Sequence, residues 1–222
     1  MRRHLKVVSF VAGVVGVVLL FYVSYPLVSY EYFARVAYPE LLSPLSVQSA
    51  TSPEIETKPK DYTKASNWFD DGKGQGYFET SKISHYTISI PSLGIEKAIT
   101  SIGGEDLEES LIQYPGTAAP GRAGNAVIFG HSILPVFYDP KNYLAIFSTL
   151  PTIKTGAEII INFDGIEYVY VVEEKFEVKP TDIQILQQDN SDSHLTLVTC
   201  TPPGDPRRPK RLIVRARIVE NI

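Results

Sequence analysis

Residues 157–163 (AEIIINF) and 166–172 (IEYVYVV) are two runs rich in β-branched and aromatic side chains, and only Asp164-Gly165 separates them. Short runs of this composition favour strands. An Asp-Gly pair between two such runs is typical of the two-residue turn in which both central residues take positive φ angles. The stretch 157–172 therefore predicts a β-hairpin.

The rest of the C-terminal two thirds also has strand character. Residues 86–90 (YTISI) alternate apolar and polar side chains, as a half-buried strand does. Helical signals are few, and we expect a helix over 106–113 and a turn or two around 144–150. Further strands are predicted at 125–130 (NAVIFG), 195–200 (LTLVTC) and 211–219 (RLIVRARIV). We expect residues 81–222 to form one all-β domain, a closed or nearly closed β-barrel with a few short helices.

Composition excludes several classes of protein. The 222-residue chain has room for one ordinary domain with attachments. A hydrophobic share of 44% with 21% charged residues excludes a wholly disordered chain. A net charge of −4 gives no basic footprint for nucleic acid. With one cysteine, the chain can form neither an internal disulfide nor an all-cysteine metal site.

Residues 7–28 are free of charge and long enough to cross a bilayer as one helix. At 1.5 Å per residue the segment reaches about 33 Å, against about 30 Å of hydrocarbon. Basic residues before it leave residues 1–6 in the cytoplasm and send the rest of the chain outside. A cleaved signal peptide is the alternative, but the run exceeds 7–15 residues and no A-x-A-like site follows it. We expect a single-pass plasma-membrane protein with an extracytoplasmic domain.

Residues 29–80 have the composition of a stalk or linker. Four prolines and a Ser/Thr-rich patch interrupt both helical and strand periodicity. Trp68 and Phe69 form an apolar pair inside this polar stretch. They either pack on the following domain or cover a binding groove, and the sequence leaves both open.

The single cysteine, Cys200, ends the predicted strand 195–200. A free buried cysteine is often a small packing residue. Here a Thr-Pro-Pro-Gly loop follows directly, and strand ends beside loops commonly hold reactive groups. An unpaired thiol outside the cell also risks oxidation, so its presence suggests use. Cys200 is therefore a candidate nucleophile, with packing as the alternative.

A cysteine nucleophile needs a neighbouring base or cation to sustain its thiolate. His4 precedes the predicted anchor, which places it on the other side of the membrane. His85 begins a strand and His194 lies in a polar loop. His131 follows the strand 125–130 directly, and Gly130 allows close backbone approach there. We expect His131 to be the partner of Cys200, with a structural histidine as the alternative.

Acyl transfer also needs a group that stabilises the oxyanion. Most basic residues after Cys200 are expected to be solvated. Arg211 differs because it opens the strand 211–219, and antiparallel pairing could bring it beside Cys200. The basic residues in question are Arg207, Arg208, Lys210, Arg211, Arg215 and Arg217.

These residues resemble a known family, the sortases, which are cysteine transpeptidases of bacterial cell surfaces. Residues 195–200 (LTLVTC) are similar to the sortase TLxTC signature, and Gly130-His131 after an apolar strand resembles the segment of the catalytic histidine. The run beginning at Arg211 resembles the arginine strand, and residues 120–125 (PGRAGN) match the PGxxGN lead-in. The order anchor, histidine, cysteine, arginine also agrees.

The resemblance implies a mechanism and its residues. Cys200 would attack a backbone carbonyl within a C-terminal LPxTG-like sorting signal, and His131 would protonate the leaving amine. Arg211 would hold the oxyanion or the backbone of the signal, and Thr199 would make a polar contact to the peptide. The thioacyl enzyme would pass to an amine acceptor, either a cell-wall cross-bridge or a pilin lysine.

The resemblance implies no cofactor. Some sortases bind calcium through carboxylates between the first helix and the histidine strand, and residues 113–131 contain none, so we predict no metal. Two other functions stay open from the sequence: a hydrolytic cysteine peptidase, in which water accepts the acyl group, and a non-catalytic β-barrel binding module.

Overall fold

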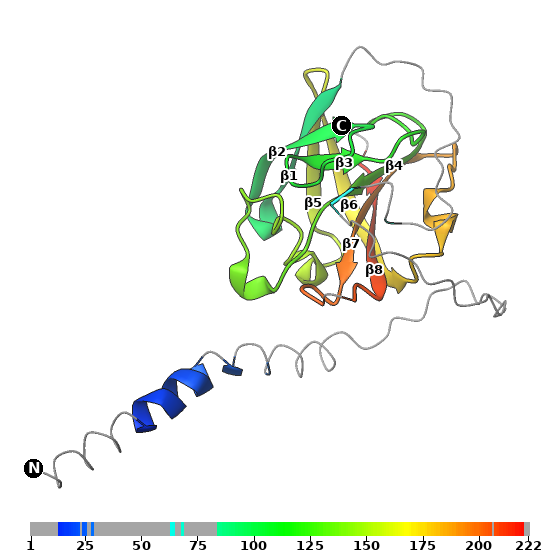
Figure 1. Ribbon diagram of the computed structural model, residues 1–222. Helices are drawn as coiled ribbons and strands as arrows, with labels where there is room; N and C mark the ends of the chain where they lie inside the picture. The colour runs from blue at the N-terminus through cyan, green and yellow to red at the C-terminus, as the bar shows by residue number, and fades with distance from the viewer. Residues whose placement is uncertain are drawn as a thin grey trace, which may run out of the picture. The chain divides into compact units, whose positions relative to one another are not determined.

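The computed structural model describes residues 13–22, 24, 25, 28, 63, 64, 68, 84–205 and 207–219. The chain divides into two compact units, Met1–Glu40 and Leu41–Ile222. In the first unit residues 13–22 are helical (Figure 1). Across the described ranges, no helix is both long and apolar enough to cross a membrane. The anchor at 7–28 lies partly outside these ranges and stays a prediction, as does nearly all of the stalk at 29–80.

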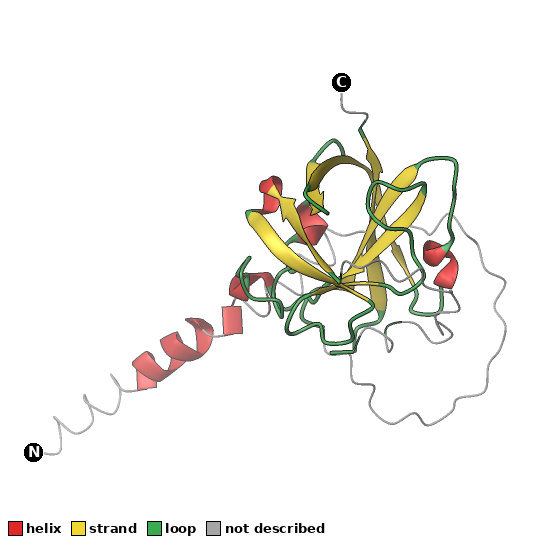
Figure 2. Ribbon diagram, turned by 90° about the horizontal axis from the view of Figure 1, so that it is seen from above, coloured by secondary structure: helices red, strands yellow, loops and turns green. Residues whose placement is uncertain are grey.

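The second unit contains a closed β-barrel, as the sequence predicted (Figures 1 and 2). Within the described residues its strands follow the order β1-β2-β3-β4-β7-β8-β6-β5 around the barrel. The pairs β2–β3 and β4–β7 are parallel, and the other neighbours are antiparallel. The strands are β1 His85–Ile90, β2 Ile95–Ile102, β3 Leu111–Gln113, β4 Gly124–Phe129, β5 Glu158–Phe163, β6 Ile166–Val178, β7 Ser193–Thr201 and β8 Lys210–Ile218.

Short 3-10 helices lie in the connections between the strands. They are η2 Pro91–Leu93, η3 Pro135–Phe137, η4 Leu150–Thr152 and η5 Ile183–Leu186. The segment before η4 forms successive turns, in which the Ser148 amide donates to the Ala145 carbonyl and the Leu150 amide to the Phe147 carbonyl. The expected turn or two around 144–150 is therefore present.

The predicted hairpin is confirmed in β5 and β6. Asp164 and Gly165 have φ angles of 55° and 75°, and Phe163 pairs with Ile166 across the turn. β6 continues six residues beyond the predicted end at residue 172. A register shift between Val172 and Glu174 breaks its alternation there, so the pattern of a strand is lost in the sequence.

The helix expected over 106–113 is absent, and that prediction was wrong. The segment turns at Asp106, whose Oδ1 accepts a hydrogen bond from the Glu108 amide, and then enters β3. All three residues of β3 are buried between β2 and β4. Since an isolated helix of this length is marginal, the two neighbouring strands decide the conformation.

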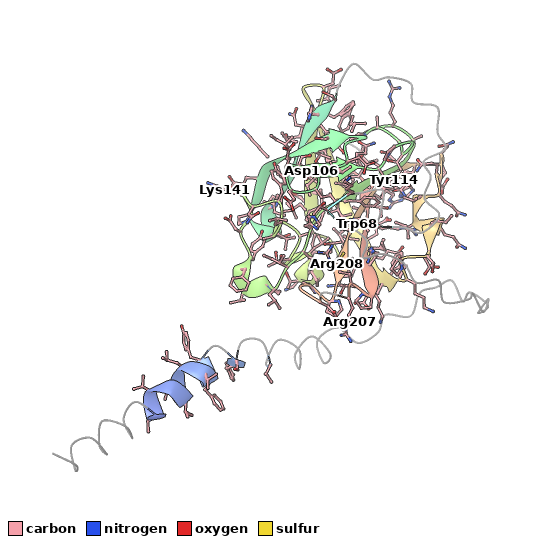
Figure 3. All side chains as sticks on the ribbon, in the orientation of Figure 1. Trp68, Asp106, Tyr114, Lys141, Arg207 and Arg208 are labelled. Atoms are coloured by element: carbon pink, nitrogen blue, oxygen red, sulfur yellow. The ribbon has the colours of Figure 1, made fainter. Side chains whose placement is uncertain are left out.

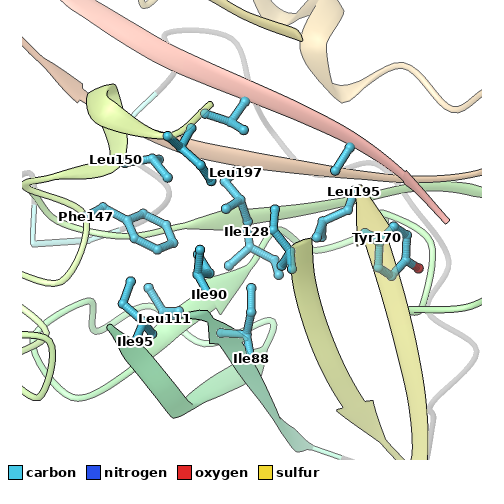
Figure 4. Packing of buried hydrophobic residues seen from close by; sticks show 14 of the residues in the cluster. Ile88, Ile90, Ile95, Leu111, Ile128, Phe147, Leu150, Tyr170, Leu195 and Leu197 are labelled. Atoms are coloured by element: carbon cyan, nitrogen blue, oxygen red, sulfur yellow. The ribbon is translucent and has the colours of Figure 1, made fainter. Parts of the chain in front are cut away.

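Side chains alternate between two apolar clusters on the two faces of the sheet. Inside the barrel, Ile128, Leu195 and Leu197 pack with Ile88 and Leu111 (Figure 4). The opposite face carries a second cluster, which contains Val127, Phe129, Val198, Cys200, Ile213 and Trp68. The thiol of Cys200 therefore lies on the outer face of the barrel wall.

Candidate active site

Cys200 and Arg211 lie directly opposite each other on neighbouring strands. β7 and β8 are antiparallel, and their register pairs Cys200 with Arg211. Both side chains are buried, with exposed fractions of 3% and 0%. Residues opposite each other in a sheet present their side chains on the same face. The register thus brings the predicted nucleophile and the predicted arginine together.

His131 reaches the same face from the other side of β7. β4 runs parallel to β7 with Phe129 opposite Val198. Continuing this register by two residues places His131 opposite Cys200. The Gly130 amide donates to the Val198 carbonyl, and the Phe147 amide donates to the His131 carbonyl. These two bonds fix the backbone on both sides of the imidazole, which is 4% exposed.

Gly130 is required by the close packing under His131. A Cβ at this position would lie 2.5 Å from Phe147 Cδ2 and 2.6 Å from Leu111 Cδ2. Real Cβ atoms do not approach carbon that closely, so any side chain here would force Phe147, Leu111 or the strand end itself to shift. The close backbone approach expected at Gly130 is thus present.

Thr199 is fully buried, and its hydroxyl donates to the Gly130 carbonyl at 2.8 Å. This hydrogen bond ties the strand of the cysteine to the segment of the histidine. A polar contact between Thr199 and a bound peptide stays a prediction.

Two opposing effects act on the Cys200 thiol. Burial raises its pKa, because the thiolate loses solvation, while the positive charges of Arg211 and Arg208 act to lower it. Burial is the larger effect, so the net pKa of Cys200 is raised. Arg208 belongs to the six basic residues of which most were expected to be solvated, and no pattern distinguishes it from its basic neighbours in the sequence.

Arg211 is held by backbone carbonyls. Its Nη1 donates to the carbonyls of Arg208 and Lys210 at 3.0 and 3.2 Å, and its Nη2 donates to the Trp68 carbonyl at 3.1 Å. The contacts on Nη1 come from Arg208 in the loop just before β8 and from Lys210, the first residue of β8. The chain itself thereby fixes the direction of the guanidinium.

Trp68, labelled in Figure 3, is fully buried and contacts two side chains of the candidate site. Its ring stacks on Phe129 at a centroid distance of 5.4 Å and lies 5.9 Å from the His131 ring. The guanidinium carbon of Arg211 is 5.4 Å from the centroid of the same indole. The sequence left open whether Trp68 packs on the following domain or covers a binding groove. The structure shows that Trp68 packs on the domain, against side chains of the candidate site.

The assembled groups are those needed for covalent acyl transfer. A thiol, an imidazole and a guanidinium from β7, the end of β4 and β8 converge on one buried face of the barrel. In the part of the chain that the structure describes, no three His, Cys, Asp or Glu side chains are grouped so as to hold a metal ion.

Comparison with protein families agrees with this arrangement. The family model of the sortase domain matches residues 88–219. Sortase A of Streptococcus agalactiae is 26% identical over 132 residues, which cover 59% of this chain and 51% of that protein. The chain thus spans about half the length of that relative. YwpE of Bacillus subtilis is 31% identical over 98 residues, which cover 44% of this chain and 86% of YwpE.

Solved structures show the same fold. A sortase D5 transpeptidase from Clostridium perfringens has a TM-score of 0.52 at 27% identity, covering 61% of this chain and 79% of that one. A lid mutant of sortase A from Corynebacterium diphtheriae has a TM-score of 0.54 at 30% identity, covering 63% and 72%.

Proposed function

Because this chain belongs to the sortase family, we propose that it is a membrane-anchored cysteine transpeptidase that acts on proteins bearing an LPxTG-like sorting signal. The observation that carries the proposal is the convergence of three side chains on one face. Cys200 is in register with Arg211, and the β4–β7 register leads His131 to the same position.

In the proposed reaction, Cys200 Sγ attacks a peptide carbonyl carbon of the sorting signal and forms a tetrahedral intermediate. The C–N bond then breaks, and His131 gives a proton to the departing amine, which leaves a thioester on Cys200. An amine acceptor attacks this thioester, loses a proton to His131 and forms a new amide bond as the C–S bond breaks, which restores the Cys200 thiolate. The proposed acceptors are a cell-wall cross-bridge and a pilin lysine.

Arg211 is proposed to bind the backbone of the sorting signal or the oxyanion. Its Nη2 already donates to a peptide carbonyl, that of Trp68. This contact supports binding of a main-chain oxygen by the same nitrogen. A carbonyl of the sorting signal would replace the Trp68 carbonyl when the peptide enters. Thr199 is proposed to assist the peptide contact.

Trp68 is proposed to act as a lid over the site. Two of the similar solved structures are described as lid mutants, one from Corynebacterium diphtheriae and one from Streptococcus agalactiae. In this chain the indole lies against both the imidazole and the guanidinium, and the thiol is buried, which supports a lid that must move before a peptide reaches Cys200.

The lid is tested by Trp68→Ala in the full-length chain. A closed state that opens 0.1–10% of the time would slow alkylation of Cys200 by about 10- to 1,000-fold, and Trp68→Ala should recover that factor. The chain has a single tryptophan, so its fluorescence should also shift to longer wavelength when a sorting peptide binds. Equal alkylation rates in the two proteins would exclude a lid.

The transpeptidase is tested by product analysis. Peptides with LPxTG-like cores are incubated with the protein, with and without an amine acceptor, and the products are identified by mass spectrometry. We expect a ligated product that is lost in Cys200→Ala, His131→Ala and Arg211→Ala. Hydrolysis alone, unaffected by any amine, would assign the chain to the hydrolytic peptidases. No reaction of any peptide, with a thiol inert to alkylation in Trp68→Ala, would favour the binding module.

A further inference from the structure

β4 leads to His131, and β7 carries Cys200. The backbone pairing between these two strands ends just before His131 and Cys200. β4 ends at Phe129, and the Gly130 amide still donates to the Val198 carbonyl at 3.1 Å. Beyond this bond, hydroxyl groups make the connection. Thr199 Oγ1 donates to the Gly130 carbonyl, and Ser132 Oγ donates to the Cys200 carbonyl at 2.8 Å.

The two hydroxyls form a reciprocal pair around the site. Thr199 precedes Cys200 and reaches the residue before His131. Ser132 follows His131 and reaches Cys200 itself, across 68 residues of sequence. Ser132 is buried, and the next residue is held from a third segment, because the Ile133 amide donates to Ser148 Oγ at 2.9 Å.

We propose that Ser132 is a positioning residue for the transpeptidase proposed above: its hydroxyl holds the Cys200 end of β7 against the His131 segment and so sets the distance between thiol and imidazole. The inference rests on the proposed function. Ser132 itself touches neither the substrate nor the reacting atoms in this role. It acts through the main chain of the nucleophile.

The effect should fall on turnover rather than on peptide binding. A displacement of about 1 Å between reacting groups can cost about a hundredfold in rate. Ser132→Ala removes the donor to the Cys200 carbonyl and leaves the remaining backbone bonds in place. We expect kcat to fall by about tenfold, with KM changed by less than about twofold.

A matched control separates positioning from simple loss of a buried hydrogen bond. Thr196 lies on the same strand as Cys200, is fully buried, and donates to Asn125 Oδ1 of β4 at 2.8 Å. Thr196→Val removes a hydroxyl bond between the same two strands, four residues from the thiol. It should lower the melting temperature and leave kcat unchanged.

Two further variants guard against a misfolded alanine protein. Ser132→Thr retains the hydroxyl, and Ser132→Val has the same shape as threonine without it. We expect kcat to be at least about fivefold higher in the threonine variant. Equal kcat values in this pair would overturn the proposal and reduce Ser132 to a structural residue.

A second readout does not depend on the sorting signal. The rate of alkylation of Cys200 by iodoacetamide is measured against pH in the full-length chain on the Trp68→Ala background. Ser132→Ala should move the midpoint of this profile to higher pH, because the thiolate loses its fixed place beside its cationic partners. Thr196→Val should not move it.

The two readouts distinguish the possible failures. If no peptide is turned over by the unaltered protein while Ser132→Ala still shifts the alkylation midpoint, the proposed function fails and the positioning role stands. If peptides are ligated but Ser132→Ala changes neither kcat nor the midpoint, the positioning role is wrong and the transpeptidase stands.

Discussion

At the scale of single residues, Arg211 is a fully buried cation whose guanidinium contacts three backbone carbonyls. A lysine ammonium is a point charge and cannot reproduce this planar arrangement of donors. Loss of an oxyanion or backbone donor typically costs about 3 kcal/mol in the barrier. We therefore expect Arg211→Lys to lower kcat/KM about a hundredfold in a ligation assay.

The control for that change is Arg215→Lys on the same strand. Arg215 pairs with Glu174 at 3.4 Å on the surface, where an ion pair contributes little. Its replacement by lysine should leave kcat/KM within about twofold. If Arg211→Lys kept the kcat/KM of the unaltered protein, only the charge of Arg211 would matter for the reaction.

The pH dependence of the Cys200 thiol provides a second prediction at this scale. Burial raises the pKa of Cys200, and the charges of Arg211 and Arg208 partly offset the increase. Arg211→Met removes a charge that stabilises the thiolate, so the pKa must rise further. The alkylation profile measured on the Trp68→Ala background should move to higher pH, and a smaller shift in the same direction is expected for Arg208→Met. A shift to lower pH would show that Arg211 does not act on the thiolate.

The sequence could predict which residues converge on the site, but not the contacts that Thr199 and Trp68 make there. Cys200, His131 and Arg211 each stand at the end of a recognisable strand, and the registers of β4, β7 and β8 bring them to one face. The hydroxyl direction of Thr199 depends on a carbonyl 69 residues away. The contact of Trp68 with Arg211 spans 143 residues. No local pattern contains such long-range contacts.

At the scale of elements, Gly130 connects β4 to His131, the proposed catalytic histidine. The missing Cβ makes room for Phe147 and Leu111 of the barrel interior. Gly130→Ala should destabilise the fold by about 1–3 kcal/mol through overpacking. It should also lower kcat, because the displaced strand end carries His131. Thermal unfolding and ligation kinetics measure the two effects separately.

Gly165 provides the control for this prediction. It lies in the β5–β6 turn with a φ of 75°, and a Cβ there would meet no atom within 4 Å. Alanine at this position should lower the free energy of unfolding by about 1–2 kcal/mol, from backbone strain alone. Gly165→Ala should therefore lower stability with no change in kcat. Equal losses of kcat in both variants would contradict a local role for Gly130.

Strands with a clear pattern could be predicted, and those defined by their neighbours could not. β1, β4, β5, β7 and β8 lie within two residues of their expected ranges, and β6 extends further. β2 and β3 were not expected. Between Ile95 and Ala98, β2 has one residue more than β1 has between Ile88 and Ile90, and this bulge and the irregular exposure along β2 hide its period. β3 has only three residues and is a strand because β2 and β4 flank it.

At the scale of the whole molecule, we expect a membrane anchor at residues 7–28. This segment is predicted from its length, its lack of charge and the basic residues before it. We expect the full-length chain to stay in the membrane fraction after washing with high salt and with carbonate, and a chain that begins at residue 29 to be released. Release of the full-length chain by either wash would contradict the anchor.

The covalent intermediate on Cys200 is tested by mass spectrometry. The Trp68→Ala chain is mixed with an LPxTG-like peptide without any amine acceptor and then digested to locate the adduct. We expect the acyl part of the peptide on Cys200 as a thioester, which an added amine converts into a ligated product. Cleavage of the peptide with no adduct on Cys200, or with the acyl group on another residue, would show that Cys200 is not the nucleophile.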